Sequence, residues 1–431
     1  MVKLKRCILL DLAVAAFGLG SWLGVNGTFL QAPLLLRRQP EGWALPSWIT
    51  LAVQLGNLGI AAHALSRRLL PRTSDAAHIY CLLATGAAAL FLNAFLHPET
   101  VSLAGADRSL AFLALTFCSA LVGCTSSVLF YPYLRYFREE YLVTYLVGEG
   151  MSGLLPSILA LIQGVGGEPE CVPSPDGSMW TAVHPLPLFD TDLFLSILGG
   201  LSIVSLLSFT YIHNTSQFDS ERKLPTESKE QRQEARVCLL EQSWVCLLAA
   251  SAALNCINNG VLNAVQSYSC MPYGAATYHL AATLKVVADP AICLAAVWIA
   301  PLSVRALVAI LAAATGPLAY MLATALLSPT PPLQDQVAGR ALIVSSWLAG
   351  AAALAYARLW VALRARRGGA RAMRACGAFG QLGSILGTLT MFLLVNFTRL
   401  FTQAPTAACP PAHTLYGDAP HAYTPTILVE V

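Results

Sequence analysis

Eleven apolar stretches, each long enough to cross a lipid bilayer, occupy most of this 431-residue chain. A hydrocarbon core about 30 Å thick needs about 20 apolar residues of helix to span it. We place the stretches at Ile8–Leu30, Ser47–Leu65, Ala77–Leu96, Leu110–Phe130, Tyr141–Gly166, Phe189–Ile212, Val237–Val265, Ala276–Ala300, Ala306–Leu327, Ala341–Val361 and Ala375–Phe397. Charged residues make up only 11% of the sequence, whereas soluble domains contain about 25%. The pattern predicts an all-α, polytopic membrane protein with eleven transmembrane helices.

The distribution of basic residues sets the expected orientation. If the stretches are consecutive spans, 20 of the 26 Lys and Arg residues lie on the side of the N-terminus, 5 lie on the other side, and Lys285 lies within a span. Cytoplasmic loops of membrane proteins are enriched in Lys and Arg. We therefore expect a cytoplasmic N-terminus and, after an odd number of crossings, an extracellular C-terminus. Because topology disperses the basic residues, the net charge of +3 indicates no nucleic-acid partner.

The longest charged stretch lies within residues 213–236 and divides the spans into two groups. A polar, charged segment of this kind is typical of a solvated connector. We expect a six-helix bundle over residues 1–212, a cytoplasmic linker over 213–236, a five-helix bundle over 237–397 and an extracellular tail over 398–431.

The seventh stretch carries the densest set of polar side chains. Its amides are Asn255, Asn259, Asn263 and Gln266, with Asn258 beside them. At about 100° per residue of α-helix, the first four fall within a sector of about 80° on one face. Polar side chains in a span are costly unless they face protein, water or ligand. The stripe therefore predicts either a cavity wall or interhelical hydrogen bonds, and Gly260 is expected to loosen the helix locally.

The first two stretches add further candidates for a binding cavity. Trp22, Asn26 and Phe29 follow one face of the first stretch, where an aromatic ring and an amide are able to stack on a flat ligand and bond its edge. Close helix packing through Gly20 and Gly24 is the alternative explanation. The second stretch offers Gln54 and Asn57, and the fifth offers Gln163 on the same face as Glu149.

Among the charged residues within the predicted spans, Glu149, Lys285 and Asp289 are candidates for a functional role. Glu149 stands near the cytoplasmic end of its stretch, where it either reaches the interface or, if buried, carries a proton. Lys285 and Asp289 are four residues apart on one helix, a spacing at which opposite charges meet. The pair either neutralises itself or belongs to a coupling or substrate pathway.

The remaining motifs exclude several classes of protein. Three of the 12 cysteines, Cys171, Cys270 and Cys409, face outward by the predicted topology, where a disulfide is plausible. We favour Cys270–Cys409, with Cys171 paired to either as the alternative. No zinc-binding spacing and no hydrolase, metalloprotease or nucleotide-binding signature is present, so we predict no metal, no cofactor and no enzymatic activity.

Four sequence strings resemble the animal riboflavin transporter family. They are FGLGSWLGVNG at 17–27, LPSWITLAVQLGNLG at 45–59, VGEGMSGLLPSILALIQGVG at 147–166 and NNGVLNAVQSYSCMPYGAATYHL at 258–280. The resemblance implies eleven spans in a six-plus-five arrangement, similar to equilibrative nucleoside transporters and the major facilitator fold. It also implies facilitated uptake of riboflavin at the plasma membrane by alternating access, without ATP or sodium. The riboflavin contacts would then come from Trp22, Asn26, Phe29, Gln31, Gln54, Asn57, Asn255, Asn259, Asn263 and Gln266.

The chain departs from the family pattern near this expected cavity. At the positions of Phe29, Gln31 and Asn263 in this chain, the family usually has Trp, Glu and Pro, respectively. At the position of Ser127 it commonly has Asn. The pair Lys285 and Asp289 is also unusual in the family. These departures keep two alternatives open. One is a transporter of another flat polar solute, such as a nucleoside or another vitamin, and the other is a receptor-like protein that no longer transports.

Overall fold

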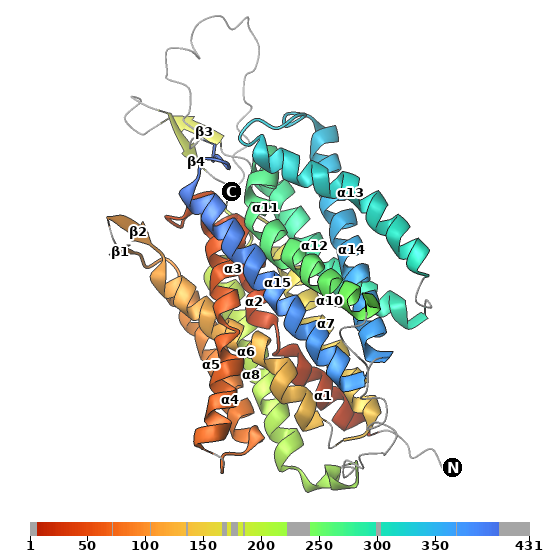
Figure 1. The fold of residues 1–431 in the computed structure, drawn as a ribbon. Coiled ribbons are helices and arrows are strands. Elements are labelled where there is room, and N and C mark those ends of the chain that lie inside the picture. Colours follow the sequence, from red (N-terminus) through yellow and green to blue (C-terminus); the bar gives the residue numbers. More distant parts are fainter. Residues whose placement is uncertain are drawn as a thin grey trace, which may run out of the picture.

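Two sets of helices, packed side by side, make up the computed structural model of this chain (Figure 1). The structure describes residues 7–70, 72–103, 105–134, 137–165, 170–173, 180–183, 186–221, 242–298, 303–367 and 369–404. Most of the expected linker and of the expected C-terminal tail, including Cys409, lies outside the described residues.

The N-terminal helices are α1 (Ile8–Leu19), α2 (Leu23–Leu35), α3 (Leu45–Leu55), α4 (Leu58–Leu69), α5 (Asp75–Leu96), α6 (Leu110–Leu134), α7 (Glu139–Gln163) and α8 (Thr191–Asn214), with short 3-10 turns η1 (Gly42–Ala44) and η2 (Ser216–Glu221).

Two antiparallel hairpins lie at one end of the molecule. They pair β1 (Val101–Leu103) with β2 (Ala106–Arg108), and β3 (Glu170–Pro173) with β4 (Trp180–Val183). In register, Val101 lies opposite Arg108 and Glu170 opposite Val183. We call this the hairpin end, shown at the top of Figure 1.

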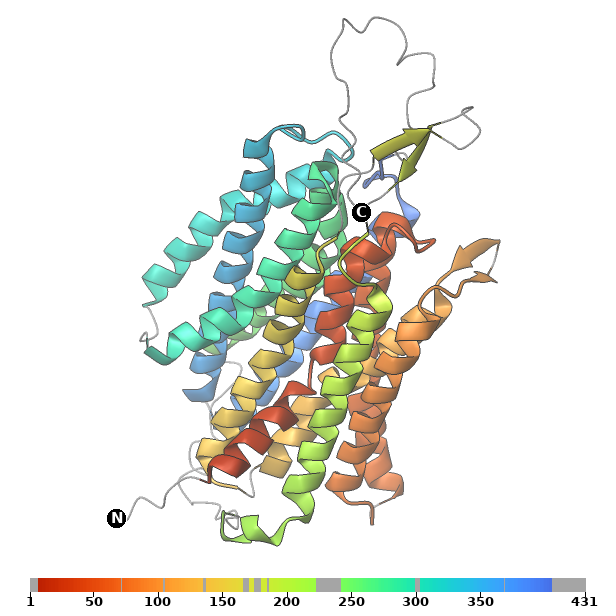
Figure 2. The same ribbon diagram turned by 180° about the vertical axis from the view of Figure 1, so that it is seen from behind.

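The C-terminal helices are α10 (Gln242–Asn255), the π-helical turn η4 (Cys256–Leu262), α11 (Asn263–Cys270), the 3-10 turn η5 (Met271–Tyr273), α12 (Ala275–Trp298), α13 (Val304–Leu326), α14 (Val337–Arg367) and α15 (Gly369–Phe397). Within the two sets, α1 packs on α7 and α8, α5 on α6 and α8, α12 on α14, and α10 on α15. Across the boundary between the sets, α12 packs on α7 and α2, while α3 packs on α11 and α15 (Figure 2).

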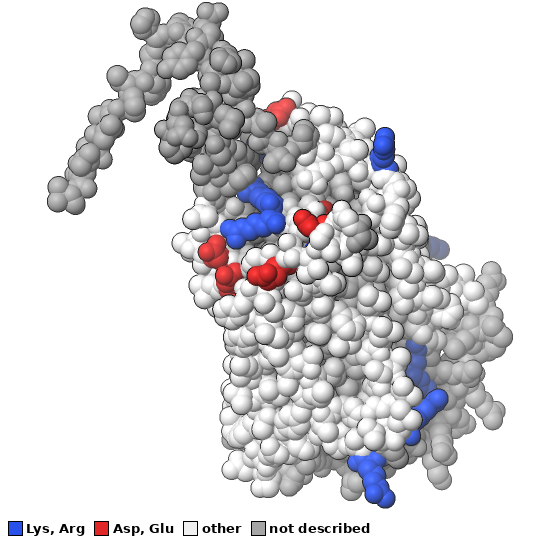
Figure 3. All heavy atoms as spheres, turned by 90° about the vertical axis from the view of Figure 1, so that its left-hand side faces the viewer, with Lys and Arg blue, Asp and Glu red and all other residues white. Residues whose placement is uncertain are grey.

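Ten of the eleven expected spans are long and apolar enough to cross a bilayer. Eight are single helical runs and two are bent helix pairs, counted over the described residues. The remaining helix, α12, has 24 residues and carries Lys285 and Asp289 near its middle. Figure 3 shows a broad face of uncharged side chains between charged groups at the two ends. A face of this kind suits contact with lipid, where charged side chains are costly.

The first span is not the continuous helix expected over Ile8–Leu30. It bends by 50° between α1 and α2. The cause is local, because the hydroxyl and the backbone N–H of Ser21 both donate to the carbonyl of Gly18, at 2.8 and 3.1 Å, and turn the chain. Kinks of this size need such an interruption of the helical hydrogen-bond ladder. The expected helix is therefore corrected to two shorter ones.

Glycines allow the closest helix contacts, which agrees with the packing explanation for Gly24. A Cβ added at Gly24 would lie 2.8 Å from Cβ of Ser119 on α6, and one at Gly383 would collide with the backbone of Ala252 on α10. Large buried rings fill the rest of the interior, including Phe17 and Phe130 in the N-terminal set and Trp347 in the C-terminal set. Small residues at contacts and aromatic rings between them are how membrane helices associate without a hydrophobic driving force.

Candidate functional site

The bend of the first span displays two predicted contact residues, and α7 holds both of them. The ring of Trp22 lies against Gly123 of α6, where a Cβ would come within 2.8 Å of ring carbons. The Trp22 side chain also lies beside the carboxylate of Glu149. Asn26 Nδ2 donates to the backbone oxygen of Ser152 at 3.2 Å. Both side chains remain partly accessible, so the bend presents an oriented ring and amide in the interior.

Glu149 is the carboxylate at the centre of this arrangement. The hydroxyl of Tyr131, on α6, donates to it at 2.9 Å, beside the contact with Trp22. The carboxylate thus ties α6, α7 and the α1–α2 bend together. The structure therefore gives Glu149 interior partners rather than a place at the interface.

The seventh span winds as a π-helix where its amides lie. Seven residues, Cys256–Leu262, form the π-turn η4, which contains Asn258, Asn259 and Gly260. Gly260 packs so closely on α15 that an added Cβ would lie 2.6 Å from Cα of Gly387. The predicted loosening at Gly260 is confirmed, and the 80° sector calculated for a continuous α-helix does not apply. Such π-turns are frequent at functional sites.

The amides of this span bond to one another along the helix. Asn259 Nδ2 donates to Asn255 Oδ1 at 3.4 Å and to Ser384 Oγ of α15 at 3.0 Å. Asn259 Oδ1 accepts from Asn258 Nδ2 at 2.9 Å. Asn263 Nδ2 donates to the backbone oxygen of Asn259 at 3.3 Å. The amides thus bond along their own helix and, through Asn259, to α15, while Asn255, Asn259 and Asn263 stay partly accessible.

Two predicted contact residues carry buried polar atoms without a hydrogen-bond partner among the described residues. These atoms are Nε2 of Gln266, on α11, and Oδ1 of Asn57, at the break between α3 and α4. Asn57 Nδ2 donates to Oε1 of Gln54 at 3.1 Å, so these two amides form a pair. Buried polar groups in native proteins are nearly always satisfied by protein, water or ligand. One unsatisfied donor and one unsatisfied acceptor therefore suit a polar ligand.

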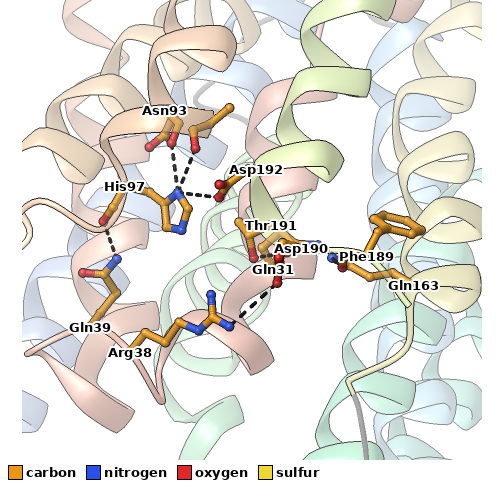
Figure 4. Close-up of polar contacts among 11 residues, drawn as sticks. Gln31, Arg38, Gln39, Asn93, His97, Gln163, Phe189, Asp190, Thr191 and Asp192 are labelled. Atoms are coloured by element: carbon orange, nitrogen blue, oxygen red, sulfur yellow. Dashed lines mark hydrogen bonds and ion pairs between the residues drawn. The ribbon is translucent and has the colours of Figure 1, made fainter. Parts of the chain in front are cut away.

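Gln31 does not offer its amide to a ligand in this structure (Figure 4). The side chain is fully buried. Its Nε2 donates to Gln163 Oε1 at 2.6 Å, and its Oε1 accepts from Thr191 Oγ1 at 2.8 Å. Gln163 in turn donates to the backbone oxygen of Phe189 at 2.9 Å. Gln31 thus links α2, α7 and α8 at the hairpin end, a structural role that its position in the sequence did not reveal.

A cavity of about 460 Å³ lies between α10, α14 and α15, toward the end opposite the hairpins. Its wall includes Asn255 of the amide stripe, together with Ser251, Arg358 and Gln381. A Cβ added at Gly377, in this wall, would meet no atom within 4 Å, so the cavity is open at this residue. The last three of these polar residues were not predicted as site residues from the sequence. Arg358 lies near a predicted span end, where it was counted only as a topological charge.

The two sets of helices are joined at the hairpin end by hydrogen bonds between described residues. Trp48 Nε1 donates to Asn396 Oδ1 at 2.9 Å, and Asn396 Nδ2 donates to Ser47 Oγ at 3.0 Å. Ser267 Oγ donates to the backbone oxygen of Trp43 at 2.6 Å. The molecule is thus fastened at the hairpin end, whereas its described cavity lies toward the other end.

The remaining predicted residues have mixed outcomes. Phe29 is partly buried against the central apolar cluster. Cys270 carries a free thiol and is fully buried, so the favoured disulfide Cys270–Cys409 is corrected. Cys270 is the last residue of α11, and its side chain packs in the central apolar cluster rather than at a surface. The side chains of Cys171, Ser127 and Asp289 lie outside the described part of the chain. Within that part, no cluster of three His, Cys, Asp or Glu side chains suits a metal ion.

Comparison with known proteins identifies the family. The sequence model described as "Solute carrier family 52, riboflavin transporter" matches residues 6–238 and 220–403. This chain belongs to that family. Members of the family are solute transporters and not enzymes.

Its relatives in the family align over nearly their full length. The chain is 34% identical to riboflavin transporter member 2 of Homo sapiens, covering 94% of this chain and 98% of the relative. It is also 34% identical to member 3-B of Danio rerio, covering 89% and 95% respectively.

Solved transporters share the fold at low sequence identity. The nucleoside transporter NupG gives a TM-score of 0.52 at 13% identity, with 92% of each chain covered. A D-xylose-proton symporter gives a TM-score of 0.53 at 15% identity, covering 90% of this chain and 88% of the other. The helices are therefore arranged as in transporters of the major facilitator type.

Proposed function

We propose that this chain takes up riboflavin across the plasma membrane by facilitated transport with alternating access. Family membership and relatives named as riboflavin transporters support riboflavin as the substrate. The observation that carries the site is a departure from regular α-helix in the first helical run of each set, a 50° bend between α1 and α2 and a π-turn in α10–η4–α11. Interrupted helices in corresponding positions of two repeats are the best indicator of a transporter's binding site.

The chemistry of these interruptions suits a flat vitamin. Trp22 supplies a ring for stacking, and Asn26 supplies an amide beside it. Asn57 Oδ1 and Gln266 Nε2 supply an acceptor and a donor that lack partners among the described residues. An isoalloxazine ring has apolar faces and polar edges, and its ribityl chain carries hydroxyls. Stacking and edge hydrogen bonds are the contacts such a ligand needs. Gln31 is left out of this proposed set because its amide is fully engaged.

For the topology, we infer that α12 is the eleventh span, which gives six spans in residues 1–212 and five in 237–397, with a cytoplasmic linker between them. The excess of Lys and Arg at the end opposite the hairpins supports a cytoplasmic N-terminus and an extracellular hairpin end and tail. With that orientation, the contacts of Trp43, Trp48 and Asn396 close the extracellular side, and the cavity beside Asn255 opens toward the cytoplasm. Rocking of the two bundles about the interrupted helices would then alternate the access.

Uptake of labelled riboflavin by cells that express this chain tests the proposal. We expect saturable uptake above mock-transfected cells, unchanged by sodium removal, displaced by unlabelled riboflavin and lumiflavin, and not by uridine. Displacement by uridine instead would favour a nucleoside carrier. Uptake equal to mock cells, with surface expression verified by biotinylation, would favour a member that no longer transports.

A further inference from the structure

Lys285 is a charged side chain near the middle of α12, where an unsolvated ammonium is costly. Its Nζ donates to Oδ1 of Asn263, on α11. The same ammonium lies 5.4 Å from the ring centroid of Trp347, on α14, a distance suited to a cation–π interaction. Trp347 is fully buried, and its indole N–H donates to Ser269 Oγ at 3.2 Å. The ammonium is therefore held by groups that have fixed positions of their own.

The partner of Lys285 belongs to the amide stripe. Asn263 accepts from the lysine through Oδ1 and donates through Nδ2 to the backbone oxygen of Asn259. Asn259 lies within the π-turn η4. A chain of hydrogen bonds thus runs from α12 through one amide to the backbone of the π-turn, and the two unusual residues Asn263 and Lys285 are bonded to each other.

The next residue of α12 faces the other set of helices. Val286 Cγ1 lies 3.3 Å from the position that a Cβ on Gly153 of α7 would take, and Asn26 Nδ2 lies 3.4 Å from the same position. Val286 therefore lies at the boundary with the N-terminal helices beside a proposed riboflavin contact. Consecutive residues of α12 face this boundary on one side and the π-turn on the other.

From this arrangement we infer that Lys285 is a positioning residue that couples the α12–α7 boundary to the π-turn η4. When α12 shifts against α7 during transport, the bond from Lys285 to Asn263 carries the shift to the backbone at Asn259. The side chains of the amide stripe then move when the contact between α12 and α7 moves. The inference rests on the proposed riboflavin transport and adds to it a residue that does not touch the substrate.

A double-mutant cycle tests the coupling. We expect Lys285→Met and Asn263→Leu each to lower the maximal rate of riboflavin uptake about tenfold at unchanged surface level. The double variant is expected to be no slower than either single variant, because apolar groups then replace both partners of the bond. Lys285→Arg keeps a cationic donor that stacks on an indole, so it should recover at least half of the wild-type rate. Arg340→Met, at the start of α14, is the matched control and should transport normally.

Each outcome decides between the inference and its foundation. If cells that express the unmutated chain take up no riboflavin, the proposed transport and this inference are both refuted. Normal uptake by Lys285→Met, or rate losses that multiply in the double variant, would overturn the positioning role alone. If purified Lys285→Met and Asn263→Leu are less stable to heat but transport normally, the bond is structural and the inference is also overturned.

Discussion

The first span of each helix set departs from a regular α-helix, but it does so differently in the two sets. In the N-terminal set, a sharp bend at Ser21 displays Trp22, and a carboxylate of the neighbouring α7 holds the ring. In the C-terminal set, a π-turn keeps the helix continuous, and its amides bond to one another and to α15. The N-terminal set therefore presents an aromatic ring for stacking, and the C-terminal set presents hydrogen-bonding amides.

The contact between Gly260 and α15 should be the most sensitive part of this comparison. An Ala side chain at 260 would press on the backbone of Gly387, which has no flexible atoms to move aside. Overpacking of this kind costs about 1–3 kcal/mol. We expect Gly260→Ala to abolish uptake and to lower the melting temperature of the purified protein. Gly316→Ala, where a Cβ meets nothing within 4 Å, should leave both unchanged.

Removal of the ring at the N-terminal bend should have the next largest effect. Aromatic stacking on a flat base contributes about 1–3 kcal/mol, so Trp22→Ala should raise the KM for riboflavin about 10- to 100-fold. Trp22→Phe keeps a ring but loses the indole N–H beside Glu149, and should raise the KM less. If initial uptake rates give an unchanged KM for Trp22→Ala, Trp22 contributes to helix packing and not to riboflavin binding.

On the C-terminal side, Asn259→Leu removes the amide that joins the π-turn to α15. The hydroxyl of Ser384 and the amide of Asn258 then lose their partner. Leaving buried polar groups unsatisfied costs about 1–3 kcal/mol. We expect uptake to fall at least tenfold while surface expression persists, and Ser384→Ala, which removes one bond, to fall less. Equal loss in both variants would show that the contact with α15, rather than the whole amide network, is what matters.

Substitutions of Glu149 distinguish a carboxylate that positions Trp22 from one that carries a proton. Glu149→Gln keeps an oxygen that accepts from Tyr131 beside Trp22, whereas Glu149→Leu keeps none. If the carboxylate only orients the ring, Glu149→Gln should retain most of the uptake and Glu149→Leu should lose about 1 kcal/mol of binding, or about fivefold in KM. Similar losses in both variants, with a flattened dependence of uptake on external pH, would instead indicate proton coupling.

The smallest effect is expected outside both interruptions, at Cys270. Because this thiol is free and fully buried, Cys270→Ser should reach the cell surface and transport at near wild-type rates. An external maleimide should not label Cys270 in intact cells. Retention of Cys270→Ser inside the cell would contradict the free thiol and restore the disulfide.

Sequence periodicity and composition were enough to predict an all-α membrane protein, the approximate limits of ten spans and, as one of two explanations, close packing at Gly24 of α2. These features follow from local rules, since a bilayer requires about 20 apolar residues per helix and close contacts require small side chains. The sequence also placed Trp22 and the amide stripe in the interior, because polar groups in a span must face a partner.

Tertiary structure alone decided what each polar group does. Gln31 and Asn259 looked alike as amides at or within predicted spans. Neighbours far away in sequence, Gln163 and Ser384, determine that one is a buried link and the other a bridge between helices. The bend at Ser21 and the contact of Lys285 with Asn263 also depend on side-chain directions that no spacing rule contains. A hydrogen bond requires both partners within about 3 Å, and that distance is fixed only when the helices have packed.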